Sequence, residues 1–164
     1  MRRIRDLCLM LVAAATLAHA APQAAPAFTL RFDRLASALT LLNDHDRAVV
    51  DQAAALIREG ENAAALARLS TLTQSNPRNS SLRILIAYAQ LQLGNLAAAL
   101  TQAKEAHDAP NGNSYRCYFL AKVAWLAGDK ATCRRELQHV KNAGDMPEAV
   151  RELQTDLKQS KPKS

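Results

Sequence analysis

Residues 60–128 read GENAAALARL STLTQSNPRN SSLRILIAYA QLQLGNLAAA LTQAKEAHDA PNGNSYRCYF LAKVAWLAG, and in this stretch Gly60, Gly94 and Gly128 stand 34 residues apart. Recurrence at a fixed period of this length is the signature of a repeat protein. The surroundings of the glycines recur as well, since an alanine precedes each and a small residue follows each at constant spacing. These flanking residues are Ala53, Ala87 and Ala121 before the glycines, and Ala65, Ala99 and Cys133 after them.

The spacing around each glycine predicts two antiparallel helices joined by a tight turn. Small and apolar residues continue after the glycine in steps of four and three, which keeps them on one face of a helix. Glycine suits the turn because it reaches a positive φ without a steric penalty and can end the preceding helix. We therefore expect an all-α fold with three helix-turn-helix units, at about residues 46–79, 80–113 and 114–146.

This pattern resembles the tetratricopeptide repeat over about residues 46–146. The resemblance rests on the alanine-to-glycine spacing, the small residue after each glycine and Pro77 at the end of the first unit. The chain departs from the family where a large aromatic residue is usual early in the first helix, because Val49, Arg83 and Arg116 or Cys117 stand there. The resemblance implies a right-handed α-solenoid and a general habit of binding other proteins, as a scaffold or adaptor does.

Residues 1–20 have the features of a secretory signal peptide. Three arginines lie at the start, an apolar run follows from Leu7 to Leu17, and Ala18-His19-Ala20 forms a small-x-small cleavage site. The apolar run is short for a membrane span. We expect cleavage after Ala20, export to the periplasm of a Gram-negative source, and no stable membrane insertion afterwards. An uncleaved N-terminal anchor is the alternative.

The remaining segments flank the repeats. Residues 21–27 form an Ala/Pro linker, and residues 28–45 are expected to hold an N-terminal helix because Leu35, Ala38, Leu39 and Leu42 fall at helical spacing. Residues 147–158 predict a capping helix at the other end, with Pro147 in its first turn. Residues 159–164 form a basic tail for which we expect no ordered structure.

The sequence offers little catalytic chemistry. His45, His107 and His139 lie in different units, so we expect no metal pair on one helix, no cofactor and no catalytic residue. Cys117 and Cys133 are expected to stay unpaired, because the turn offsets them by about six residues, roughly 9 Å along the helix axes. A neighbouring helix or a second chain remains an open partner for Cys117. The net charge of +6 comes from scattered residues and does not indicate nucleic-acid binding.

The first helices of stacked pairs line a concave face, and we expect this groove to bind a partner. Four of its predicted residues are aromatic, and rigid aromatic side chains are favoured contact residues. Two alternatives stay open: helix packing or the cap buries these side chains, or the segment 28–43 with Phe28 and Phe32 lies in the groove. The predicted groove residues are Arg47, Ile84, Tyr88, Leu91, Tyr115, Tyr118, Lys122 and Trp125.

The predicted function is therefore a non-enzymatic binding or assembly module that holds a peptide or a partner helix. Only Arg47 and Lys122 are basic among the groove residues, so an apolar or aromatic-anchored partner is expected rather than an acidic tail. One alternative is a structural subunit of an envelope complex that serves secretion, pilus assembly or cell division. Another is a periplasmic redox or hydrolase accessory protein.

Overall fold

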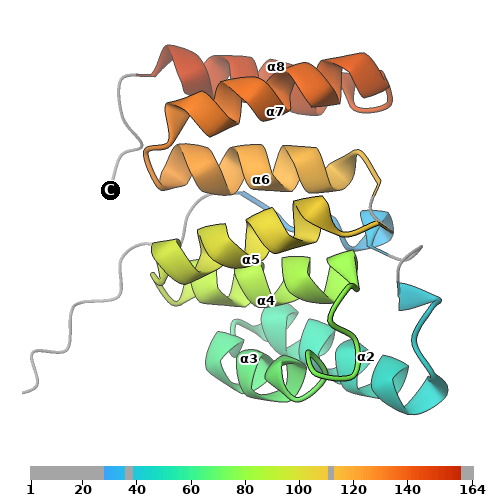
Figure 1. Ribbon diagram of the computed structural model, residues 1–164. Helices are drawn as coiled ribbons and strands as arrows, with labels where there is room; N and C mark the ends of the chain where they lie inside the picture. The colour runs from blue at the N-terminus through green and yellow to red at the C-terminus, as the bar shows by residue number, and fades with distance from the viewer. Residues whose placement is uncertain (1–27, 36–38, 111–112, 160–164) are drawn as a thin grey trace, which may run out of the picture.

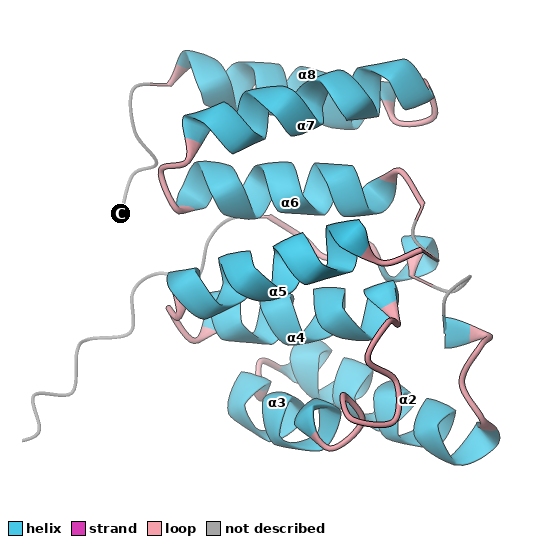
Figure 2. Ribbon diagram, in the orientation of Figure 1, coloured by secondary structure: helices cyan, strands magenta, loops and turns pink. Residues whose placement is uncertain are grey.

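A computed structural model describes residues 28–35, 39–110 and 113–159. The predicted signal peptide, the Ala/Pro linker and residues 160–164 of the tail lie outside the described residues. Within the described part the chain is all-α, with seven α-helices, one short 3-10 helix and no strand (Figures 1 and 2). The elements are η1 (Phe32–Arg34), α2 (Asp44–Glu59), α3 (Asn62–Ser70), α4 (Ser80–Gln92), α5 (Leu96–Asp108), α6 (Tyr115–Leu126), α7 (Lys130–Ala143) and α8 (Pro147–Lys158).

Glycine ends one helix and turns the chain into the next at each repeat. The φ angles of Gly60, Gly94 and Gly128 are 85°, 79° and 82°, in the left-handed region that favours glycine. Polar side chains start several of the helices; for example, the Asn79 side chain accepts a hydrogen bond from the Leu82 amide, and Asp129 accepts one from Thr132. Local sequence therefore fixes where these helices begin and end.

The helices stack in the order in which they occur along the chain (Figure 1). Each helix packs on the one that follows it, and the alternate helices α2, α4, α6 and α8 also contact one another in sequence. Small residues make the close helix contacts possible, because larger side chains would hold the helix axes farther apart. The predicted packing residues are fully buried: Ala53, Ala65, Ala87, Ala99, Ala121 and Cys133.

The N-terminal segment differs from the predicted helix over residues 28–45. Residues 28–31 are not helical, η1 covers only Phe32–Arg34, and α2 begins at Asp44; residues 36–38 lie outside the described part. The physical reason is burial against the stack, because Phe28 and Leu30 are both buried there. In an extended chain, side chains two residues apart lie on the same face, so Phe28 and Leu30 can both pack against the stack. Tertiary contacts thus explain why the start of the predicted helix is not helical, whereas Leu39, just after the undescribed residues, is helical.

No helix among the described residues combines the length and the apolar character needed to cross a membrane.

Candidate functional site

Helix α6 lies at the centre of the predicted site. We call the side of α6 that contacts α4 and α8 its inner side. Aromatic side chains from α4, α6 and residues 28–35 meet there. The Phe28 ring packs edge-on against Tyr88, Tyr118 and Phe119, with centroid separations of 5.8, 6.4 and 5.7 Å. Tyr115 and Tyr118 are neighbours at 5.7 Å. We call Tyr88, Tyr118 and Phe119 the aromatic cage, because together they surround the ring of Phe28.

Hydrogen bonds hold the backbone of the N-terminal segment over α4 and α6. The Arg31 amide donates to the Tyr115 hydroxyl at 2.9 Å, and the Ser81 hydroxyl donates to the Leu35 carbonyl at 2.8 Å. The Asn113 side-chain amide donates to the Arg34 carbonyl, also at 2.8 Å. Residues 28–35 are thus held along their length by side chains that contact their backbone. We call these residues the N-terminal segment.

Helix α8 covers the other end of the α6 inner side. The Lys122 ammonium lies 2.8 Å from Glu152 and 2.6 Å from Asp156, and is itself only 5% exposed. The Tyr118 hydroxyl donates to Glu152 at 2.8 Å, and the Trp125 indole N–H donates to the Asp156 carbonyl at 3.0 Å. The polar side chains of α6 therefore form hydrogen bonds and ion pairs with α8, and these contacts hold α8 against α6.

The environment sets the protonation of this cluster. Burial raises the pKa of Tyr115 to about 12, and burial followed by the hydrogen bond to Glu152 raises the pKa of Tyr118. Burial acts to raise the pKa of Glu152, but hydrogen bonds from Lys122 and Tyr118 outweigh it, so that this pKa is lowered. At neutral pH both hydroxyls keep their protons. The Tyr118 hydroxyl donates to the Glu152 carboxylate, and the Tyr115 hydroxyl accepts from the Arg31 amide.

The structure brings most predicted groove residues together but does not leave them open. Trp125 is 7% exposed and Tyr118 is 4% exposed, so neither of these predicted groove residues is open to solvent. The N-terminal segment and α8 cover them. Arg47 is exposed and donates to the carbonyls of Thr40 and Leu42 instead. Tyr88 is half-buried, and the remaining groove residues, Ile84, Leu91, Tyr115 and Lys122, are buried.

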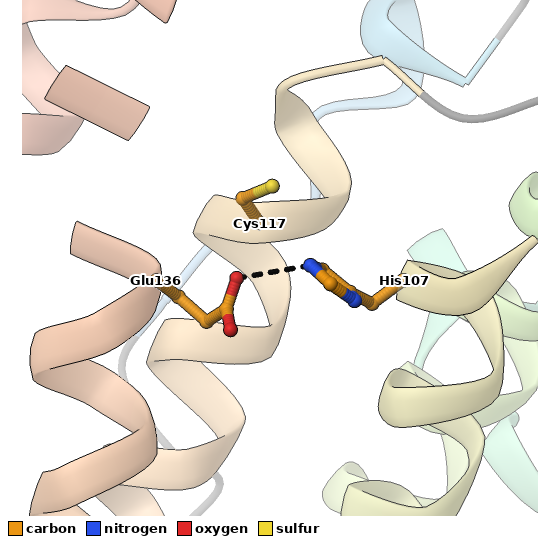
Figure 3. A group of neighbouring side chains, drawn as sticks. All are labelled: His107, Cys117 and Glu136. Atoms are coloured by element: carbon orange, nitrogen blue, oxygen red, sulfur yellow. Dashed lines mark ion pairs between the residues drawn. The ribbon is translucent and has the colours of Figure 1, made fainter. Parts of the chain in front are cut away.

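A second polar cluster, not predicted, lies beside α6. His107 and Glu136 point toward one another from α5 and α7, and Cys117 lies on α6 between them (Figure 3). The sequence holds a signal for this contact: Cys117 is eleven residues before Gly128 and Glu136 eight after it. In antiparallel helices the two are therefore offset by only three residues, about 4.5 Å along the axes. Cys117 and Cys133 are both free, as expected.

Comparison with known proteins adds no identity. No family model matches the chain, and no curated protein or solved structure matches it.

Proposed function

We propose that this chain is an exported, non-enzymatic protein-binding module of three tetratricopeptide-like helix pairs in a right-handed solenoid. Its inner face holds an extended peptide that carries an aromatic anchor. One observation carries the proposal: the N-terminal segment lies on this face, with Phe28 in the aromatic cage and its backbone hydrogen-bonded to side chains of the stack.

The contacts are of two kinds that together suit peptide recognition. Hydrogen bonds from Ser81 and Asn113, and to Tyr115, contact the segment's backbone and so do not depend on its sequence. The aromatic cage receives one large apolar ring, which selects for an anchor residue. A partner segment with an aromatic residue followed by a few extended residues would meet the same groups.

Residues 28–35 then act as a competitor within the chain. A tethered segment has an effective concentration of about the millimolar range, so an external peptide has to displace it before binding. The anchoring ion pairs at its flanks are weak, since the Arg31 guanidinium lies 3.8 Å from an exposed Glu148. The segment is therefore held mainly by Phe28 and the backbone hydrogen bonds.

The predicted signal peptide supports a place outside the cytoplasm for this binding. Cleavage after Ala20 leaves the N-terminal segment close to the new N-terminus, separated from it by the Ala/Pro linker of residues 21–27. The mature chain then begins at Ala21. Intact mass of protein recovered from a periplasmic extract tests this, and a retained Met1 in the membrane pellet contradicts it.

Binding of a labelled peptide tests the function. The peptide AFTLRFDRL has the sequence of residues 27–35, and it is titrated against the full-length chain with fluorescence anisotropy. Phe28→Ala weakens the internal competitor, so this variant is expected to bind the peptide about tenfold more tightly than the wild type, or better. A peptide with alanine in place of its first phenylalanine is expected not to bind.

Phe32→Ala is the matched control. The Phe32 ring lies under the Arg58 guanidinium, 4.1 Å from it, and makes none of the ring contacts of the aromatic cage. This variant is expected to bind the peptide like the wild type. The proposal fails if the Phe28→Ala chain does not bind the peptide, or if both variants bind it equally.

A further inference from the structure

Three helices bring three different metal-ligating side chains to one point beside α6. His107 comes from the last turn of α5, Cys117 from the first turn of α6 and Glu136 from the middle of α7 (Figure 3). Their nitrogen, sulfur and oxygen ligand atoms all lie within 4.8 Å of one another. Imidazole, thiolate and carboxylate are the three ligand types that Zn²⁺ takes in proteins.

The surroundings of Glu136 give a second indication of a bound cation, beside the clustering of the three ligand atoms. Its side chain is fully buried, and one carboxylate oxygen, Oε1, accepts a hydrogen bond from Arg135 at 2.9 Å. The other, Oε2, lies 3.0 Å from Nε2 of His107 but is a buried atom without a hydrogen bond. Burying a carboxylate oxygen without a partner is costly, and such atoms are rare in folded proteins. The oxygen is aimed at the point where His107 and Cys117 also present their ligand atoms.

A neighbouring carboxylate orients the histidine. Oδ1 of Asp108 lies 3.0 Å from Nδ1 of His107. When Nδ1–H donates to this carboxylate, the lone pair of Nε2 is left for a metal, which is the arrangement common to metal-binding histidines. The half-buried His107 and Cys117 also leave a path from solvent to the cluster.

We propose that His107, Cys117 and Glu136 bind one Zn²⁺ ion, with water in the fourth position. A tetrahedral zinc with bonds of about 2.0 to 2.3 Å holds its ligand atoms roughly 3.3 to 3.6 Å apart. The cluster reaches that spacing when the most distant ligand atoms close by about 1 Å and the Nε2–Oε2 pair, now 3.0 Å apart, opens by a few tenths of an ångström. The mixed nitrogen and sulfur ligands favour zinc over magnesium or calcium, which take oxygen ligands. The bound ion would tie α5, α6 and α7 together.

The competing account is a simple ion pair between protonated His107 and Glu136, in which Cys117 takes no part. The two accounts differ in whether the thiol contacts a metal. The test uses the full-length chain, reduced, in a Cys8→Ser background so that Cys117 and Cys133 are its only thiols. Zn²⁺ alone is titrated in competition with a chelating indicator, and Co²⁺ is then substituted to report on thiolate ligation by its charge-transfer absorption.

The expected result is one Zn²⁺ per chain and a thiolate-to-cobalt absorption band. His107→Ala and Cys117→Ala are each expected to weaken zinc binding at least about 100-fold, since loss of a direct ligand exceeds the usual effect of losing an outer-shell partner. The matched controls are Cys133→Ala and His45→Ala, which change the same residue types outside the cluster. Both are expected to bind zinc like the wild type.

Two results overturn the proposal. The first is a wild-type chain that takes up no stoichiometric zinc or shows no thiolate band with cobalt, a measurement that needs no variant to fold. The second is zinc binding that survives unchanged in both His107→Ala and Cys117→Ala while far-ultraviolet circular dichroism shows both to be folded. Neither result bears on the binding of the peptide to the inner face, so the two proposals fail separately.

Discussion

Helix α6 carries a polar cluster on each of two sides, and the two differ in how completely they are paired. On the inner side, Lys122 has a carboxylate from Glu152 and another from Asp156, and the Trp125 N–H has a carbonyl. On the other side, Oε1 of Glu136 accepts from Arg135, while Oε2 lies 3.0 Å from Nε2 of His107 and is buried without a hydrogen bond. Buried charges are normally compensated. The first cluster is fully paired and holds α8 against α6, whereas the second has a buried oxygen without a hydrogen bond, as a site has before its ligand binds.

The largest expected effect comes from Trp125→Ala on the paired side. The indole is 7% exposed and hydrogen-bonded to α8, so its removal is expected to cost about 3 to 5 kcal/mol of unfolding free energy. Urea unfolding of the variant and the wild type measures this. A cost below about 1 kcal/mol would mean that the indole is free in solution and that α8 does not cover it.

Lys122→Met is expected to cost about 3 kcal/mol. It removes the cation and leaves the carboxylates of Glu152 and Asp156 close together without a positive charge between them. The same urea titration applies, with Lys130→Met as the control because that lysine lies outside the cluster. Equal stability of the Lys122 and Lys130 variants would show that the inner cluster is no more tightly paired than the half-buried Lys130.

High pH is expected to weaken the inner side as Tyr115 ionises. Burial raises its pKa from the ordinary 10.0 to about 12, so the folded state keeps a proton that the unfolded state has already lost. This stability is present below pH 10 and is lost as the pH rises to about 12, amounting to about 2 to 3 kcal/mol. Urea unfolding at pH 9 to 12 should show a smaller decline in Tyr115→Phe. An identical decline in the two proteins contradicts the assignment.

The smallest effect is expected on the incompletely paired side. In the presence of a chelator, Glu136→Gln removes a buried charge whose Oε2 has no hydrogen bond, so stability should change by less than about 1 kcal/mol. Urea unfolding with and without Zn²⁺ measures it, and only the wild type should gain stability from the metal. A loss as large as that of Lys122→Met would mean that Glu136 is as firmly paired as Asp156.

The sequence predicts the helices and turns well because their signals are local. Gly60, Gly94 and Gly128 adopt the positive φ of the predicted turns, and α8 spans the residues expected of the last helix. It leaves open whether the inner face is covered, because burial of Trp125 depends on contacts that no local pattern encodes. Both alternatives occur: α8 covers Trp125, and Phe28 packs against Tyr88. Residues 28–31 at the start of the predicted N-terminal helix are not helical, because Phe28 and Leu30 are buried against the stack.

The cluster of His107, Cys117 and Glu136 was missed for a related reason. Each residue lies on a different helix, so no short sequence motif contains them. Metal-ligand spacing within one helix therefore gives no sign of the cluster. The distances from Gly128 along the sequence indicate that Cys117 and Glu136 are offset by only three residues, about 4.5 Å along the helix axes. A repeat period thus predicts lateral contacts as well as helices, when positions are counted from the turn.

Exchange of the Arg31 amide proton with solvent tests most directly whether the N-terminal segment lies on the inner face. This amide donates to the Tyr115 hydroxyl at 2.9 Å, so its exchange in the wild type should be slow, and Tyr115→Phe should make it fast while the amides of α4 stay protected. Hydrogen exchange measured by NMR gives both values in one experiment. An Arg31 amide that exchanges in the wild type as fast as in the free peptide of residues 27–35 would contradict the account.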